Sequence, residues 1–180
     1  MASRSNIDDG FVRVASFSDL SAQKKICVKV EDRNVAVFHV NDSVYALDLF
    51  CYHAGGPLVS GDIEDIDGRM CVICPWHRHQ ITLTEGESLY VAIDPQNPRH
   101  RERKSKGVKQ RTHEVQVIGN DVYLRLSTST NQEHIESDNY YTDLYKTFRE
   151  NYVVPDYSPN SLAVPLHSRR TGKDLKKYYN

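Results

Sequence analysis

Short stretches rich in apolar residues run along the first 127 residues of the chain. They are five to eight residues long and rich in β-branched and aromatic residues, as β-strands are. Polar turn residues separate several of them, notably at 32–34, 41–43 and Gly119-Asn120. The predicted strands cover residues 11–17, 24–31, 33–40, 43–50, 80–84, 88–93, 113–118 and 121–127. Because no helical pattern lies between them, the sequence predicts an all-β fold, a small antiparallel barrel or sandwich.

The pattern changes at Ser127. The stretch that follows is polar and without period, which indicates a linker. Within 140–152, apolar residues recur at helical spacing, and the remainder holds three of the seven prolines and ends basic. The apolar stripe consists of Tyr141, Leu144, Tyr145, Phe148 and Tyr152. We therefore predict an N-terminal tail (1–10), one domain (11–127) and an extension (128–180) made of a linker, a docked helix at 140–152 and a basic tail.

Composition narrows the class of protein. Hydrophobic residues make up 39%, charged residues 26%, and the formal net charge is −1, so composition indicates no polyanionic partner such as nucleic acid. No apolar run approaches the roughly 20 residues of a membrane span, and the first ten residues lack the apolar core of a leader. These features predict a cytoplasmic protein, expected to be monomeric, whose four cysteines stay reduced.

Two cysteines and two histidines stand out by their spacing. They form a C-x-H pair and, after 20 intervening residues, a C-x-x-H pair, each beside residues that turn sharply, Gly55-Gly56-Pro57 and Pro75. The candidate ligands are Cys51, His53, Cys74 and His77. Two thiolates and two imidazoles are the ligands of a Rieske [2Fe–2S] centre, in which the histidines raise the potential above that of an all-cysteine cluster.

Two other readings of these residues stay open at this point. A Cys2His2 zinc site uses the same side chains, although zinc fingers group their cysteines first and their histidines last. Cys71 and Cys74 also form a CxxC that resembles a redox dithiol. Against the dithiol, the intervening Val72-Ile73 favours extended chain, in which residues three apart point to opposite faces.

The segments CYHAGGPL and CPWHRHQITLTEGES resemble the Rieske ferredoxin family, and GDIEDIDGRMCVICPWH and SKGVKQRTHEVQV resemble its small soluble members in animals. The resemblance covers about residues 11–127. It implies a Rieske fold, with an antiparallel base domain and an inserted cluster-binding subdomain. It also implies a [2Fe–2S] cluster whose two irons are bound by Cys51 with Cys74 and by His53 with His77, the histidines lying near solvent.

The chain departs from the respiratory members of that family in ways that bear on the redox potential. Gly56 and Trp76 stand where those proteins have a disulfide, and His79 stands where they have a serine that donates to a bridging sulfide. Arg78 replaces the usual glycine. Without the disulfide and the hydroxyl, we expect a potential in the lower part of the Rieske range of roughly −150 to +300 mV.

These features predict a one-electron carrier between a reductase and an acceptor such as an oxygenase, rather than an enzyme by itself. The alternative is a non-catalytic module that senses redox state or iron through the same cluster. A basic segment, 100–111, is interpreted as a solvated loop in preference to a docking site for an acidic redox partner.

Overall fold

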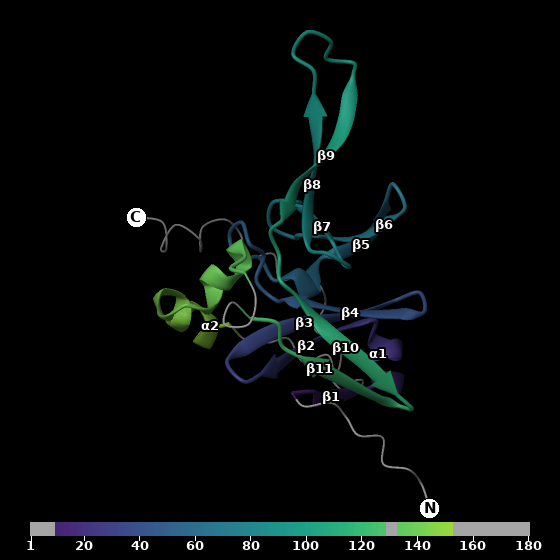
Figure 1. Ribbon diagram of the computed structural model, residues 1–180, viewed down its shortest axis with the longest axis vertical. Helices are drawn as coiled ribbons and strands as arrows, with labels where there is room; N and C mark the ends of the chain where they lie inside the picture. The colour runs from purple at the N-terminus through teal and green to yellow at the C-terminus, as the bar shows by residue number, and fades with distance from the viewer. Residues whose placement is uncertain (1–9, 129–132, 153–180) are drawn as a thin grey trace, which may run out of the picture.

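The structure, a computed structural model, describes residues 10–128 and 133–152. Its first sheet has the strand order β1-β11-β10-β4-β3-β2, and every pair is antiparallel (Figure 1). The strands are β1 (Val12–Ser16), β2 (Lys25–Val30), β3 (Arg33–Val40), β4 (Ser43–Asp48), β10 (Thr112–Ile118) and β11 (Asp121–Arg125). The two edge strands, β1 and β2, lie near each other, so the sheet is a nearly closed barrel.

A second antiparallel sheet is inserted between β4 and β10. Its order is β5-β6-β7-β8-β9, with β5 (Asp62–Ile66), β6 (Arg69–Ile73), β7 (Gln80–Thr82), β8 (Glu87–Ile93) and β9 (Arg101–Val108). A long β8–β9 ribbon projects from the body of the molecule (Figure 1). The predicted all-β fold, an antiparallel base domain with an inserted subdomain, is confirmed.

Two segments of the structure differ from the sequence prediction. The strand predicted over 11–17 ends at Ser16, because the Ser16 hydroxyl accepts a hydrogen bond from the Asp19 N–H (3.1 Å) and caps the short helix α1 (Phe17–Gln23). The basic segment predicted to be a solvated loop is largely strand β9. Strand periodicity is hidden there because both faces of the ribbon are exposed and carry charge.

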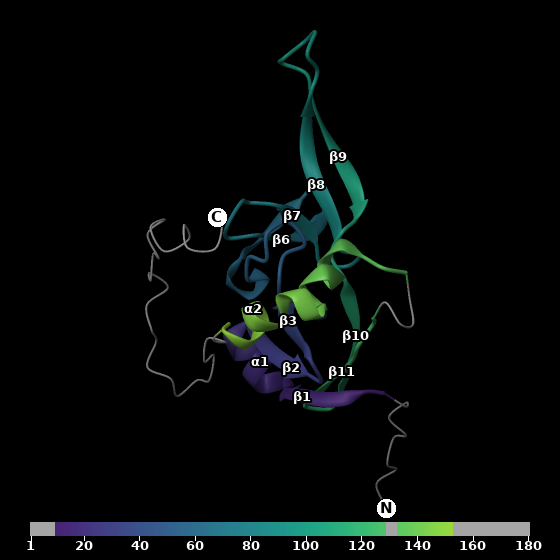
Figure 2. The ribbon, with the colours of Figure 1, turned by 90° about the vertical axis from the view of Figure 1, so that its left-hand side faces the viewer.

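The chain between Glu136 and Glu150 forms three short helical elements instead of the one helix predicted at 140–152. They are η2 (Glu136–Tyr141), η3 (Asp143–Tyr145) and α2 (Lys146–Glu150), and they lie beside the barrel (Figure 2). Leu144 points to solvent with 85% exposure, whereas the other four members of the apolar stripe pack against neighbours. The predicted tail at 1–9 and the basic tail at 153–180 lie outside the described residues.

Two large apolar clusters fill most of the interior described by the structure, beside a smaller third one. One fills the barrel and includes Leu20, Val35 and Leu124. The other lies between the two sheets and includes Phe50, Cys51 and Cys74, so the two candidate cysteine ligands are part of the packed core. Within 10–128 and 133–152, no helix has the length and apolarity needed to cross a bilayer.

Candidate metal centre

The four candidate ligands lie on two loops that share one backbone pattern. The first loop (49–57) follows β4, and the second (74–79) joins β6 to β7. In each, the cysteine N–H donates to the carbonyl five residues on, and the cysteine carbonyl accepts from the N–H four residues on. These bonds are Cys51 to Gly56 (2.9 Å) and Gly55 to Cys51 (2.8 Å), then Cys74 to His79 (2.9 Å) and Arg78 to Cys74 (2.9 Å).

Both loops turn at the fourth residue after the cysteine, which has a left-handed backbone. This residue is Gly55 in the first loop (φ 76°) and Arg78 in the second (φ 56°). Glycine adopts this conformation without cost, whereas a residue with a Cβ does so at a cost of about 1 kcal/mol. The second loop therefore turns at Arg78, and not only at Pro75 as the sequence had suggested.

The two thiols lie side by side beneath the loops. Cys51 is 0% exposed and Cys74 is 1% exposed. A hydrogen bond from the Cys51 thiol, aided by the N–H groups of Trp76 and His77, lowers the pKa of Cys74 to about 6. The same bond, together with burial, raises the pKa of Cys51, although the N–H groups of His53 and Ala54 oppose this. In both loops, the N–H groups two and three residues after the cysteine are directed at its sulfur.

The two candidate imidazoles lie at the surface. His53 and His77 are exposed, and their ring centroids are 5.0 Å apart. A third histidine joins them, since the His79 ring lies 4.3 Å from that of His53. Burial, followed by the charges of His53 and Lys106, lowers the pKa of His79 and favours its neutral form. The pairs of ligands are therefore arranged with sulfur inside and nitrogen outside.

This arrangement fits a cluster that takes two protein ligands per iron. Among the described residues, no three His, Cys, Asp or Glu side chains converge as they would around one metal ion. A Rieske cluster requires two thiolates and two imidazoles as separate pairs, and the four candidate side chains lie in two such pairs. Gly56 leaves room beside the sulfur, because a Cβ there would lie 2.8 Å from Cys74 Sγ and 3.1 Å from the Trp76 ring.

Polar side chains that the sequence reading had not singled out surround the site. The Tyr52 hydroxyl contacts His79 Nδ1 (2.9 Å) and Ser88 Oγ (2.7 Å), so His79 is held by a side chain of the first loop. Gln110 is fully buried and binds the backbone on both sides of Cys51. No local signal marks Gln110 for this role, because its partners lie about 60 residues earlier in the chain.

The remaining cysteines have different surroundings. Cys71 belongs to a small cluster with Ile66, Ile73 and Leu89, on the face of the sheet away from Cys74. Burial raises the pKa of Cys71 to about 11 and that of Cys27 to about 12. No disulfide joins any of the four cysteines, all of which are described. Cys71 therefore has the environment of a packed thiol, not of a reactive dithiol partner.

Comparison with known proteins identifies the family. Residues 12–129 match soluble Rieske-type ferredoxins. This chain belongs to that family. It is 41% identical over 139 residues to a human Rieske domain-containing protein, a match that covers 77% of this chain and 87% of the relative.

More distant matches agree with this family. A ferredoxin component of a naphthalene 1,2-dioxygenase system from Pseudomonas putida is 25% identical over 83 residues, covering 46% of this chain and 76% of that protein. A solved structure, a putative NADH-dependent nitrite reductase small subunit from Mycobacterium tuberculosis, shares the fold with a TM-score of 0.51 at 20% identity, covering 66% of this chain and 96% of that one. Membership of the family implies a [2Fe–2S] cluster.

Proposed function

We propose that this Rieske-type ferredoxin is a one-electron carrier between a reductase and an acceptor, with a [2Fe–2S] cluster held by Cys51, His53, Cys74 and His77. The observation that carries the proposal is the matched pair of loops, each with its thiol buried and its imidazole exposed. When bound, such a cluster accepts and releases one electron at a time. We also propose that residues 11–127 form the cluster domain and 128–180 an extension to it.

The protein's own groups have separate roles in this proposal. The hydrogen bond between the two cysteine side chains lowers the pKa of Cys74, which favours the thiolate, the form that binds metal. N–H groups directed at both sulfurs stabilise negative charge there. His53 and His77 lie at the surface, and we propose that electrons enter and leave through this exposed edge.

The surroundings of His79 support a potential in the lower part of the Rieske range. Its ring occupies the position where respiratory members have a serine, and Tyr52 holds it by a hydrogen bond of 2.9 Å. The second loop therefore offers no hydroxyl at that position to a bridging sulfide. Fewer hydrogen bonds to the cluster leave its reduced form less stabilised, which lowers the potential.

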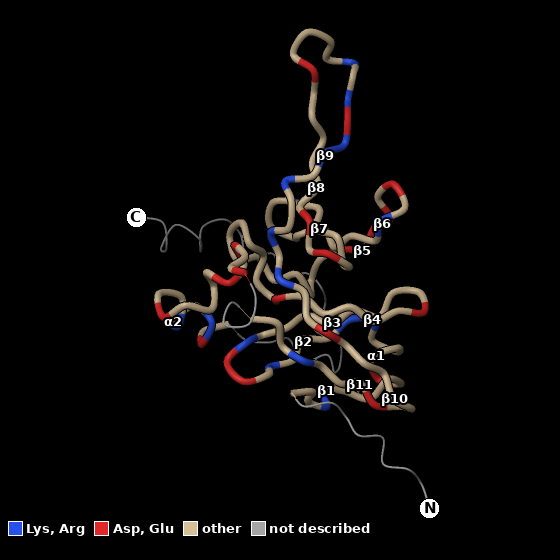
Figure 3. Tube along the Cα trace, viewed as in Figure 1, with Lys and Arg blue, Asp and Glu red and all other residues tan. Residues whose placement is uncertain are grey.

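Several basic side chains of the segment 100–111 already have acidic partners within the protein. Arg103 pairs with Asp67 (2.6 Å) and Lys104 with Glu102 (3.2 Å), while the Lys109 ammonium contacts Glu136. Figure 3 shows blue and red segments interleaved along the ribbon. These pairs favour a structural role for the charges of β9. We therefore propose that redox partners dock at the exposed histidine edge, without assigning the partner a charge.

The test is an absorption and electron paramagnetic resonance spectrum of the purified protein, with iron, sulfide and zinc quantified. We expect a Rieske spectrum and two irons and two sulfides per chain, as the cluster formula requires. Cys51→Ser and His77→Cys should each alter the spectrum, whereas Cys71→Ser should leave it unchanged. Zinc without sulfide would overturn the proposal.

A second candidate function, a redox- or iron-sensing interaction module, is favoured by one observation. Gly55 in the first loop touches Tyr140 and Phe148 of the C-terminal extension, so a change in the loop would reach that segment directly. Stopped-flow reduction by a ferredoxin reductase, followed by reoxidation by an oxygenase, separates the two functions. Rapid turnover supports the carrier, whereas slow turnover with cluster-dependent partner binding supports the sensor.

A further inference from the structure

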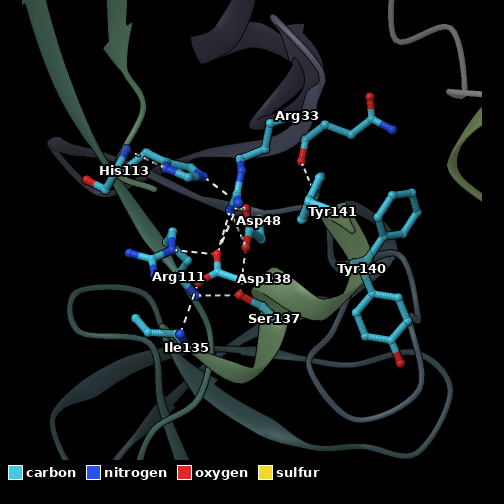
Figure 4. A network of polar contacts seen from close by, with 12 residues as sticks. Arg33, Asp48, Arg111, His113, Ile135, Ser137, Asp138, Tyr140 and Tyr141 are labelled. Carbon is cyan, nitrogen blue, oxygen red and sulfur yellow. Dashed lines mark hydrogen bonds and ion pairs between the residues drawn. The ribbon is translucent and has the colours of Figure 1, made fainter. Parts of the chain in front are cut away.

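The segment 133–152, here called the strap, is anchored to the barrel through buried charged groups (Figure 4). The Asp138 carboxylate accepts hydrogen bonds from Arg33 (3.0 Å) and from Arg111 Nε (2.7 Å), and the Ser137 hydroxyl donates to Asp48 (2.6 Å). All five side chains are less than a tenth exposed. Buried charges tolerate few alternative positions, because a misplaced charge loses its partner in a poorly solvating interior. The network therefore fixes where the strap lies.

The anchored end of the strap is connected to the backbone around Cys51. Ser137 bonds on both sides of Gln110, since its N–H donates to the Lys109 carbonyl (3.2 Å) and its hydroxyl accepts from the Arg111 N–H (2.9 Å). The Gln110 side chain donates to the carbonyls of residues 48 (2.9 Å) and 50 (3.0 Å) and accepts from the N–H of residue 52 (2.9 Å). The route from the strap to the first loop is thus continuous.

The part of the strap that follows Asp138 packs aromatic rings against the first loop. A Cβ added to Gly55 would lie 2.9 Å from the Tyr140 ring and 3.0 Å from the Phe148 ring, so both rings are in direct contact with this glycine. The Phe50 ring lies 5.1 Å from that of Phe148 and 5.2 Å from that of Tyr152, in edge-on geometry. The loop is therefore held between Gln110 and these rings.

The second loop is held in another way. It closes the β6–β7 hairpin, in which Ile73 pairs with Gln80, so its ends are fixed by neighbouring strands. The first loop joins two different sheets, and its ends pair at the isolated Phe50–Pro57 bridge, where the Leu58 N–H donates to the Leu49 carbonyl (2.8 Å). The two loops have the same internal backbone bonds, but only the second is closed by a hairpin of one sheet, and a segment held by fewer strand neighbours opens locally at lower free-energy cost. The first loop gains the most from a support outside the Rieske domain.

We propose that the strap is a working part of the cluster site, in which Phe148 and Tyr140 are positioning residues for the loop that carries Cys51 and His53. This inference rests on the proposed function, because it takes those two residues as ligands. Opening of the first loop would remove one thiolate and one imidazole together. The strap therefore controls how long the cluster is retained.

The test compares the two loops within one molecule by hydrogen exchange of the cluster-loaded protein, read by mass spectrometry on peptides spanning 49–57 and 73–80. We expect Phe148→Ala to speed exchange in the first peptide and cluster loss, followed by absorbance, by about tenfold. The second peptide should keep its wild-type rate. Phe148→Leu, which keeps an apolar contact and a stable fold, should show a smaller change in the same direction.

Two controls separate positioning from general destabilisation. Leu144→Ala alters an exposed residue of the same strap and should change neither peptide. Leu20→Ala opens the separate barrel cluster and should lower stability without changing the ratio of the two exchange rates. Equal acceleration of both peptides in the Phe148 variants, or wild-type exchange in both, would overturn the inference. If wild-type protein holds no iron and sulfide, the proposed function fails instead, and this outcome is read from the metal analysis alone.

Discussion

Replacing Asp138 with asparagine removes the charge that anchors the strap and leaves two buried guanidinium groups with one carboxylate fewer. Burial raises the pKa of Asp138, but the hydrogen bond from Arg111 and the charge of Arg33 outweigh it and lower the pKa to about 2, against an ordinary 3.8. That difference corresponds to about 2.5 kcal/mol of stability at neutral pH. For a chain of this size, the apparent Tm should fall by about 5–10 °C.

The stability difference between wild type and Asp138→Asn should decrease as the pH falls. A carboxyl whose pKa is lower in the folded than in the unfolded protein stabilises the fold above the unfolded pKa, and this contribution is lost as pH falls through the folded pKa. The wild-type advantage over Asp138→Asn should therefore be complete above about pH 5, near half at about pH 3, and absent below about pH 1.

Thermal unfolding followed by circular dichroism, at one scan rate for every variant, measures this difference. Asp143→Asn is the matched control, because it removes the same charge from an exposed position of the same strap. The reasoning is refuted if both variants lose the same stability, or if the gap between wild type and Asp138→Asn is as wide at pH 3 as at pH 7.

Three further predictions concern the loops. Gly56→Ala should lower the iron and sulfide content, since its methyl group would lie 2.8 Å from Cys74 Sγ; full cluster content would contradict the fit of the site. Arg78→Gly should raise the apparent Tm by a few degrees, because glycine adopts the left-handed backbone without the cost of about 1 kcal/mol that arginine carries there. The substitution loses only an exposed 3.5 Å ion pair with Glu64. His79→Ser should raise the midpoint potential by about 50 mV in a redox titration, the effect of one added hydrogen bond, and an unchanged or lower potential would argue against this account of the low potential.

Apart from β6, the sequence predicted the strands rich in β-branched and aromatic residues, and it missed the two made largely of charged residues, β5 and β9. In β3, six consecutive residues are buried and the apolar signal is strong. In β9, six of the eight residues carry charge or a hydroxyl and almost all are exposed, so no periodic pattern exists to be found. The short strand β5 (DIEDI), at the edge of its sheet, is acidic for the same reason, since three of its five residues are exposed. Strand prediction from apolar composition works only where burial favours apolar residues.

The candidate site likewise has a part that the sequence predicts and a part that it does not. Spacing alone brought out Cys51, His53, Cys74 and His77, because ligands within a loop must lie close in sequence. The support provided by Gln110 was not predictable, since its three hydrogen bonds join the connection between β9 and β10 to the end of β4 and the first loop. Such contacts depend on the finished sheet order and leave no mark on either segment.

The two loops show what the fold must add to a shared local pattern. Both use the same pair of backbone hydrogen bonds around the cysteine, and both turn at a left-handed fourth residue. The second loop needs nothing more, because the β6–β7 hairpin fixes its two ends in register. The first loop connects two sheets and its ends meet at a single bridge, Phe50–Pro57, so its geometry depends also on Gln110 from one side and on the strap from the other. A change in the strap should therefore act on one half of the proposed ligand set, Cys51 and His53, before it acts on the other.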